Sequence, residues 1–206
     1  MNTAQEQANW AFFKQGDKEA FAVLFRDYYK LLVQYGRRIN PDIEVVEDCI
    51  QELFLELWQS RERIASPESV KGYLFKVLKT KIFRVYAHSQ QFTDITDGAE
   101  GLQEFSYEAL LVAEQGSSEA KQKLEDALLG LSNRQREALY LKFYNRLSYE
   151  EMSEVMGVNY QTVRNLVHQS IKKLRSQLTL TSVATVAGWL SISGLLGLAI
   201  WLLLEL

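Results

Sequence analysis

The sequence of 206 residues has few prolines, cysteines and histidines, and each shortage excludes a class of protein. Two prolines and eleven glycines leave few breaks, so long helices are expected. The one cysteine, Cys49, falls in an apolar helical stripe, which excludes a disulfide framework and a cysteine-based metal cluster. His88 and His168 are far apart in the sequence and have no partners at ligand spacing. The chain has no glycine-rich phosphate loop, HExxH motif or nucleophile elbow, so it nominates no catalytic residue, metal or cofactor.

Basic residues are not in excess either, because the formal net charge is −3. The charges are nevertheless segregated along the chain. Residues 42–56 hold six acidic side chains and no basic one, whereas residues 71–91 hold five basic side chains and no acidic one. Local patches determine contact with nucleic acid, because the Debye length is only about 8–10 Å at ordinary salt. The net charge therefore does not exclude a DNA-binding protein.

The segment from 147 to 178 predicts two helices joined by a tight turn. Ser148 and Glu151 can form a capping box, Gly157 can end the first helix in a left-handed conformation, and Asn159 can cap the second helix. Arg, Asn and Gln side chains near the start of the second helix can pair with base edges in the major groove. This is the helix-turn-helix pattern. The alternative is an ordinary helical hairpin whose polar face is only solvated.

Four helices are predicted in the first part of the chain, from apolar residues at three- and four-residue steps. They cover residues 4–15, 18–38, 42–58 and 70–91, with Asp17 as a cap and a polar loop at 59–70. The last of them interleaves cations with aromatic rings, a combination suited to holding single-stranded DNA. Its alternative is a basic surface helix whose aromatic rings all lie in the core. For the helix at 42–58, which carries the acidic run, the alternative to a binding surface is a helix face that is only solvated.

An acidic segment, 92–118, separates these helices from a second helical block in which Ser132 and Gln135 predict another capping box. After this block, residues 176–204 form a run of 29 residues without a charge. A spanning helix needs about 20 apolar residues. We therefore expect a C-terminal transmembrane helix that anchors the protein to the inner membrane. The cations Lys172, Lys173 and Arg175 precede it, so the domains before it should lie in the cytoplasm. The alternative is a buried helix packed on the soluble domains.

Five segments carry a family resemblance. They are GDKEAFAVLFRDYY (16–29), VEDCIQELFLELW (46–58), VKGYLFKVLKTKIFRVY (70–86), LSNRQREALYLKFYNRLSYEEMSEVMGVNYQTVRNLV (131–167) and IKKLR (171–175). In this order they resemble the bacterial RNA polymerase sigma factors of the extracytoplasmic-function (ECF) type, over roughly residues 8–178. One departure is His168-Gln169-Ser170, where many members of the family carry an arginine-rich run.

The resemblance implies an all-α fold of two small helical domains joined by an acidic linker, to which the expected transmembrane helix is added. The expected parts are a sigma-two-like domain at 1–91, the linker at 92–118, a sigma-four-like helix-turn-helix domain at 119–178 and the hydrophobic tail at 179–206.

The implied function is promoter recognition and strand opening, without enzyme activity. The implied partners are promoter DNA, core RNA polymerase (through its β′ coiled coil and β flap) and a membrane-bound anti-sigma factor that acts as regulator. The hydrophobic tail makes the membrane a further expected partner. In the family, the loop matching 59–70 captures a flipped base, which must leave the stack to be read.

The resemblance also assigns site residues. The expected polymerase contacts are Asp48, Gln51 and Glu52. The expected contacts with the minus-ten element are Arg61, Arg63, Lys71, Tyr73, Lys76, Lys79 and Arg84. The expected contacts with the minus-thirty-five element are Gln161, Thr162, Arg164, Asn165, His168, Gln169, Lys172 and Lys173.

Three other functions remain as alternatives. One is a membrane-tethered helix-turn-helix regulator that acts without docking on core polymerase. Another is a two-component-type or quorum-type regulator, which should have an α/β receiver or a ligand domain in front of its helix-turn-helix. Residues 1–91 show helical periods throughout and no β-alternation, which argues against such a domain. The last is a membrane signalling protein that binds only protein, which would leave the basic and aromatic helix at 70–86 unexplained.

Overall fold

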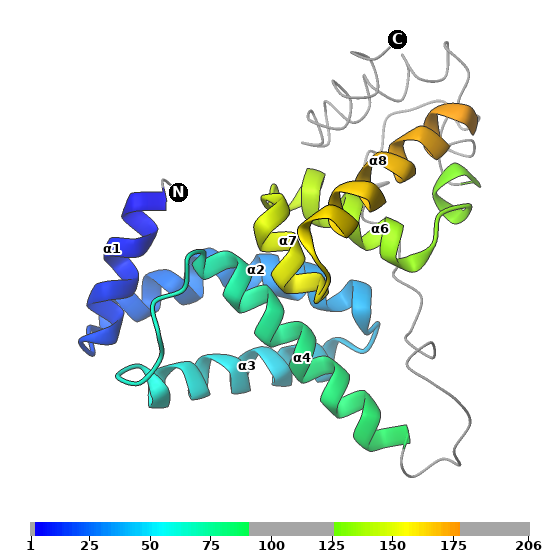
Figure 1. The fold of residues 1–206 in the computed structure, drawn as a ribbon. Helices are drawn as coiled ribbons and strands as arrows, with labels where there is room; N and C mark the ends of the chain where they lie inside the picture. Colours follow the sequence, from blue (N-terminus) through cyan, green and yellow to red (C-terminus); the bar gives the residue numbers. More distant parts are fainter. Residues whose placement is uncertain (1–2, 91–125, 178–206) are drawn as a thin grey trace, which may run out of the picture. The chain divides into compact units, whose positions relative to one another are not determined.

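The computed structural model of the protein describes residues 3–90 and 126–177, and helices make up most of both stretches (Figure 1). The described helices belong to two compact units. The first unit holds helices α1 to α4, and the second holds α6, the π-helical turn η2, α8 and the larger part of α7. The predicted all-α class with two helical parts is therefore confirmed.

The first unit is built around its second helix. Its helices are α1 (Thr3–Lys14), α2 (Lys18–Ile39), α3 (Ile43–Ser60) and α4 (Val70–Gln90), each within two residues of its predicted bounds. Helix α2 packs against each of the other three, and α3 and α4 also pack against one another (Figure 1). The loop between α3 and α4 is correspondingly shorter than predicted and spans residues 61–69.

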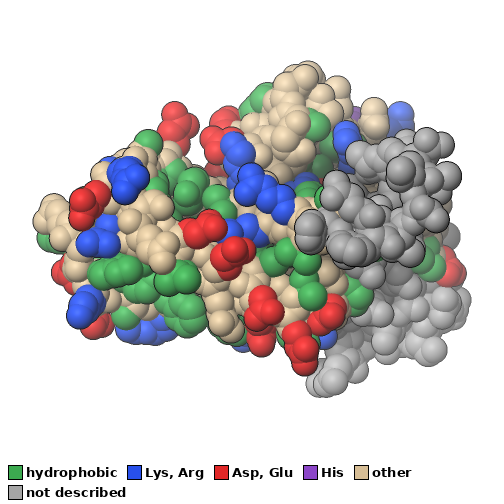
Figure 2. Space-filling view, turned by 90° about the horizontal axis from the view of Figure 1, so that it is seen from below, with side chains coloured by type: hydrophobic (Ala, Val, Ile, Leu, Met, Phe, Trp, Pro, Cys, Tyr) green, Lys and Arg blue, Asp and Glu red, His purple; other side chains and the backbone are tan. Residues whose placement is uncertain are grey.

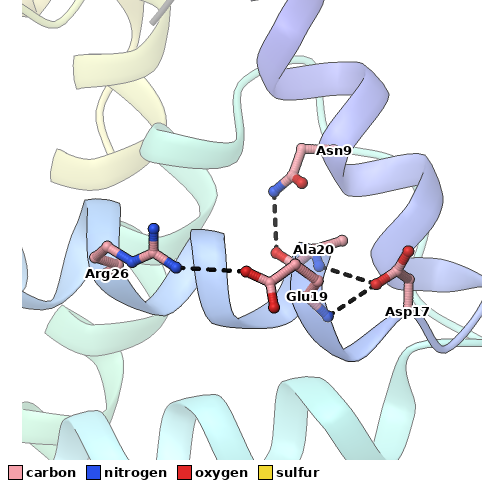
Figure 3. Close-up of polar contacts among 5 residues, drawn as sticks. All are labelled: Asn9, Asp17, Glu19, Ala20 and Arg26. Atoms are coloured by element: carbon pink, nitrogen blue, oxygen red, sulfur yellow. Dashed lines mark hydrogen bonds and ion pairs between the residues drawn. The ribbon is translucent and has the colours of Figure 1, made fainter.

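Helix α1 is fastened to the first turn of α2. The Asp17 carboxylate caps α2 by accepting hydrogen bonds from the backbone N–H groups of Glu19 and Ala20, at 2.8 and 3.1 Å. The side-chain amide of Asn9 donates to the carbonyl oxygen of Ala20 at 3.0 Å (Figure 3). The neighbouring ion pair between Glu19 and Arg26 is exposed, so it contributes little to stability. The capping prediction for Asp17 is confirmed.

Large apolar side chains from all four helices form the core of the first unit. The largest fully buried ones are Trp10, Phe13, Leu24, Leu32, Tyr35, Ile50, Leu53, Leu74, Phe75, Leu78 and Ile82. Cys49 is buried as well, which agrees with its place in the apolar stripe of α3. Burial of such side chains is the main stabilising contribution to a domain of this size.

The second unit contains the predicted helix-turn-helix, formed by α7 (Tyr149–Met156) and α8 (Tyr160–Gln177). Ser148 and Glu151 make both hydrogen bonds of a capping box. Gly157 ends α7 with φ 64° and ψ 33°, a left-handed conformation that favours glycine. The side chain of Asn159 accepts from the backbone N–H of Thr162 at 2.7 Å. All three capping predictions for this motif are confirmed.

Helix α6 (Asn133–Leu139) packs against α8 and continues directly into the π-helical turn η2 (Tyr140–Tyr144). Ser132 and Gln135 form the capping box predicted for α6. The π turn was not predicted. At the end of this turn, the backbone N–H of Asn145 donates to the carbonyl oxygen of Tyr140, five residues back, at 3.1 Å. The 3.6-residue apolar period of the sequence does not reveal such a turn, because a single π-helical turn inserts only one extra residue into the helix.

The fold class needs one correction. The sequence predicts a C-terminal transmembrane helix at 179–206, but within residues 3–90 and 126–177 no helix is long and apolar enough to cross a membrane. The tail itself lies outside these residues. The prediction rested on the length, the apolar composition and the preceding cations of this segment, which supply hydrophobicity and orientation without establishing a helix. The fold class is therefore all-α with two helical units, and the predicted membrane anchor and membrane partner have no structural support.

A close approach between α2 and α3 gives a first prediction. A Cβ atom built on Gly36 would lie 2.5 Å from Cγ1 of Val46, which is closer than real atoms come. Alanine is favoured over glycine by about 1 kcal/mol inside a helix, yet we expect Gly36→Ala to lower the free energy of unfolding by about 1–3 kcal/mol through overpacking.

Urea unfolding measures this effect. In a Val46→Ala background the clash is removed, so Gly36→Ala should cost less there than in the wild-type protein, as a double-mutant cycle would show. A Gly36→Ala protein as stable as the wild type would contradict the close approach of the two helices.

Candidate functional site

An open hollow of about 660 Å³ lies along α3 and is called here the acidic groove. Asp48, Gln51 and Glu52, the three residues expected to contact the polymerase, all line it and are exposed. Its other lining residues are Val45, Cys49, Leu55 and Val85. Figure 2 shows one face of the molecule on which acidic side chains gather beside exposed hydrophobic ones. The structure therefore brings the three predicted residues together.

Two apolar residues of the acidic groove were missed by the sequence reasoning. The residue Leu55 is 57% exposed and Val85 is 43% exposed, so both present aliphatic surface to solvent. The sequence does contain a signal for Leu55: this apolar residue falls outside the apolar stripe of α3 and should therefore be exposed. Carboxylates beside exposed aliphatic side chains suit a partner helix that carries both basic and apolar residues.

Lys81 of α4 joins the acidic helix to the basic one. Its Nζ atom lies 3.0 Å from Glu52 Oε2 and 2.9 Å from Glu56 Oε1, and its side chain is only 8% exposed. Burial by itself lowers the pKa of Lys81, but hydrogen bonds and charges from Glu56 and Glu52 outweigh it and raise the pKa above the usual lysine value. The ammonium thus stays protonated and is committed to α3, so it is not available to DNA.

A smaller pocket of about 100 Å³, called here the loop pocket, lies between the end of α3, the loop 61–69 and the start of α4. It is lined by Leu53, Glu56, Leu57, Ser60, Ile64, Tyr73 and Val77. Burial, and then the charge of Glu56, raises the pKa of Tyr73, so its phenol is neutral in this wall. Only Tyr73 among these residues was predicted as a site residue.

The two arginines of the loop differ in their surroundings. The guanidinium of Arg61 lies 4.7 Å above the ring of Trp58 and donates to the carbonyl oxygen of Trp58 at 2.8 Å. It also approaches Glu62 at 3.4 Å. Arg61 thus serves the end of α3, whereas Arg63 is exposed.

The cations of α4 do not all lie on one face. Lys76 and Arg84 are exposed, and Lys79 lies 5.7 Å from the ring centroid of Phe83 between them. Helical spacing spreads these three residues over about 140° of the circumference of α4, because Lys79 and Arg84 are five residues apart. Lys71 is half-buried and lies about 80° beyond Lys79, at the far edge of this arc. The predicted set therefore divides into one cationic face and a separate Lys71.

The aromatic side chains of α4 are divided between surface and core. Phe75 is fully buried, and its ring lies 5.0 Å from that of Tyr35. Tyr73 is half-buried and meets the ring of Trp10 edge-on at 5.9 Å. The expectation that the aromatic rings are free for unstacked bases is therefore wrong for Phe75, for which the core alternative holds.

Helix α8 presents a continuous polar stripe in the second unit. It contains Gln161, Arg164, Asn165, His168 and Lys172, all exposed and at helical spacing. The side-chain amide of Gln161 donates to Oδ1 of Asn165 at 3.1 Å. Five of the eight residues predicted to contact the minus-thirty-five element thus share one face.

The other three residues predicted on α8 have different surroundings. Gln169 is exposed beside the stripe, and Thr162 is half-buried next to the cap of the helix. The Lys173 ammonium donates to the carbonyl oxygen of Gly130, so it ties α8 to the turn before α6. Lys173 is therefore a structural contact as well as a surface cation.

An aromatic pair at the start of the helix-turn-helix was not predicted. Tyr160, the first residue of α8, is 43% exposed, and its ring meets that of Tyr149 edge-on at 5.8 Å. The Lys142 ammonium lies 4.2 Å from the centroid of the Tyr149 ring. The residues predicted for this helix were Gln, Thr, Arg, Asn, His and Lys and did not include Tyr160, although its place directly after the cap is visible in the sequence. Among the described residues, no cluster of His, Cys, Asp or Glu could hold a metal ion.

Comparisons with known proteins match both units. Residues 24–91 match the family model "Sigma-70 region 2", and residues 121–174 match "Sigma-70, region 4". The chain is 25% identical to RNA polymerase sigma factor YlaC of Bacillus subtilis over 166 residues, covering 79% of this chain and 94% of that one. It is 24% identical to ECF RNA polymerase sigma factor SigW of Bacillus subtilis over 172 residues, covering 80% and 92%.

A solved structure has a similar fold. It is the sigma factor RpoE in complex with the anti-sigma factor NepR from Bartonella quintana, with a TM-score of 0.50 and 18% identity, covering 76% of this chain and 95% of that one.

The ion pairs of Lys81 give a prediction for pH dependence. A raised pKa in the folded state means that the stabilisation is fully present below the ordinary lysine value of 10.5 and is lost as the pH rises through the folded-state pKa. We therefore expect the difference in free energy of unfolding between the wild type and Lys81→Met to stay constant from neutral pH to about pH 10 and to shrink above it.

Urea unfolding at a series of alkaline pH values measures this difference. Ionisation of tyrosines destabilises both proteins alike, so only their difference reports on Lys81. A difference that stays constant at pH values well above the lysine range would show that the two ion pairs add nothing to stability.

Proposed function

The chain belongs to the ECF sigma factors, which direct RNA polymerase to promoters in transcription initiation, and from that premise we propose how its surfaces divide the work. The proposed domains are residues 1–91 for polymerase docking and the minus-ten element, a linker at 92–118, and residues 119–178 for the minus-thirty-five element. Sigma factors are in general DNA-binding regulators rather than enzymes, and they act in the cytoplasm with the polymerase.

The acidic groove is the proposed docking site for the β′ coiled coil of core polymerase. Asp48, Gln51 and Glu52 supply hydrogen-bond acceptors, and Leu55 supplies aliphatic contact area. Lys81 holds Glu52 in place, so this carboxylate is oriented before the partner arrives. Charge complementarity of this kind increases association rate and specificity more than it increases affinity. The acidic groove is the observation on which the docking proposal rests.

The loop pocket is the proposed site for a base flipped out of the minus-ten element. Tyr73 gives it an aromatic wall, while Ser60 and Glu56 bring polar atoms to its lining. A flipped base is read by stacking and by hydrogen bonds along its Watson–Crick edge, which these side chains can provide.

The melted strand would then follow the cationic face of α4. Lys76, Lys79 and Arg84 lie along this face, and the exposed Arg63 lies in the preceding loop. Cations at this spacing can neutralise successive phosphates. Arg61 and Lys71 have lesser proposed roles, because Arg61 is engaged with Trp58 and Lys71 is half-buried at the edge of the cationic face.

The stripe on α8 is the proposed reader of the minus-thirty-five element. Arg164, Asn165 and Gln161 lie within the first turns of the helix, where side chains reach base edges in the major groove. His168, Gln169 and Lys172 would continue the contact along the groove, and Tyr160 would extend it at the start of the helix. The β flap is the proposed polymerase contact of this second domain.

An anti-sigma factor is the proposed regulator, since a relative of the same fold is found in complex with one. The rival function is a helix-turn-helix regulator that does not dock on core polymerase. It is not favoured, because the chain matches sigma region 2 as well as region 4, and the acidic groove would have no purpose.

Polymerase docking is tested by replacing Asp48 and Leu55 together with alanine. We expect the affinity for core polymerase to fall by about 1–4 kcal/mol, because the variant loses one carboxylate and one apolar contact of the proposed interface. A binding titration with purified core enzyme measures the change. Asp27→Ala on α2 is the matched control, since Asp27 is also an exposed aspartate of this unit but does not line the groove. Equal affinities for the double variant and the control would contradict the docking assignment.

Base reading is tested by comparing Arg164→Ala with Lys172→Ala. We expect Arg164→Ala to cost about 1–3 kcal/mol on the preferred promoter and to relax preference at one position of the minus-thirty-five element. Lys172→Ala should weaken binding to all sequences alike and reduce its salt dependence. Holoenzyme binding to promoter variants at several salt concentrations measures both effects. If the two variants behave alike, Arg164 holds a phosphate and does not read a base.

A further inference from the structure

Helix α1 reaches the loop that borders the loop pocket. The side-chain amide of Gln7 donates to two consecutive carbonyl oxygens of this loop, Pro67 O at 2.9 Å and Glu68 O at 3.1 Å. The two residues are 60 and 61 positions away in the sequence. Because both partners are acceptors, only the NH₂ end of the Gln7 amide can serve them, and its two N–H groups match the two oxygens.

The hydrogen bonds of Gln7 hold the loop where it joins α4. The next residue, Ser69, accepts a hydrogen bond from the backbone N–H of Gly72 at 3.1 Å and so caps the start of α4. One turn further along α1, Trp10 is buried and packs edge-on against Tyr73, a wall of the loop pocket. Helix α1 thus supports the loop and the aromatic wall of the pocket at once.

Helix α1 is itself held firmly enough to act as a support. Asn9 ties it to α2, and the buried ring of Phe13 packs against Phe21 at 5.9 Å and Trp58 at 6.4 Å. Yet α1 lies before residues 24–91, the range that matches the sigma region 2 model. The described contacts therefore give a role to a helix that the family match does not cover.

We propose that Gln7 is a positioning residue for base capture: by holding the loop at residues 67 and 68, it sets the shape of the loop pocket and thereby the preference for the flipped base. This inference rests on the proposed function of the pocket. Gln7 need not touch DNA. Its effect is transmitted through the loop, which carries Ile64, and is reinforced by Trp10 behind Tyr73.

The test uses the full chain, assembled with core polymerase, and single-stranded oligonucleotides that carry each of the four bases at each position of the minus-ten element. Gln7→Glu keeps the size of the side chain but places a carboxylate against two carbonyl oxygens. We expect the preference at one position to fall about tenfold, the factor for two lost hydrogen bonds, while preferences at the other positions and the affinity for core polymerase stay unchanged. Gln7→Leu, which adds no charge, should give the same loss of preference.

Gln5→Glu is the matched control, because Gln5 is an exposed glutamine on the same helix and its substitution adds the same charge. It should leave every preference within about twofold of the wild type, a change below that of one hydrogen bond. A uniform loss of affinity for all oligonucleotides in both Gln7 variants, or unaltered preferences in both, would overturn the proposal.

A pocket-filling variant, Val77→Phe, separates this inference from the proposed function on which it rests. If the pocket captures the base, Val77→Phe should abolish the preference at the same position, and thermal unfolding confirms that the variant is folded. A folded Val77→Phe protein that keeps the preference would refute the pocket itself. Loss of preference in Val77→Phe together with unaltered preference in both Gln7 variants would refute only the role of Gln7.

Discussion

The buried ammonium of Lys81 makes the interaction on which the polar edges of both hollows of the first unit depend. An acidic helix and a basic helix lie side by side, and a single cation bonds two carboxylates that are one turn apart on α3. One of them, Glu52, lines the acidic groove, and the other, Glu56, lines the loop pocket. Both hollows therefore share one support, and one carboxylate at the edge of each is held by the same cation before any partner binds.

Charge segregation explains how a chain with a net charge of −3 can present surfaces of both signs. The exposed carboxylates Asp48 and Glu52 are on α3, whereas Lys76 and Arg84 are on the outer side of α4 and Arg164 and Lys172 are on α8. Screening confines each patch to its own neighbourhood. A sigma factor needs this separation, since it must meet a protein and a polyanion without one surface cancelling the other.

The sequence predicted what depends on local order. Apolar periodicity located the helices, and Asp17, Ser132 and Ser148 located helix starts, because caps and amphipathic faces are properties of neighbouring residues. It could not predict the contact of Gln7 with residues 67 and 68, the pairing of Lys81 or the burial of Phe75, because these depend on which helices meet. The transmembrane helix was predicted from the length, composition and flanking charges of one segment, and no helix among the described residues is long and apolar enough to cross a membrane.

The hydrogen bond between Gln161 and Asn165 has a consequence for attempts to retarget the protein. Each side chain restricts the rotamers of the other, so part of the entropy lost on contact with DNA has already been lost in the free protein. Exchanging one of them for a residue chosen to read a new base also releases its neighbour. The effects of single substitutions at these two positions will therefore not add, and libraries for altered promoter preference should vary positions 161 and 165 as a pair.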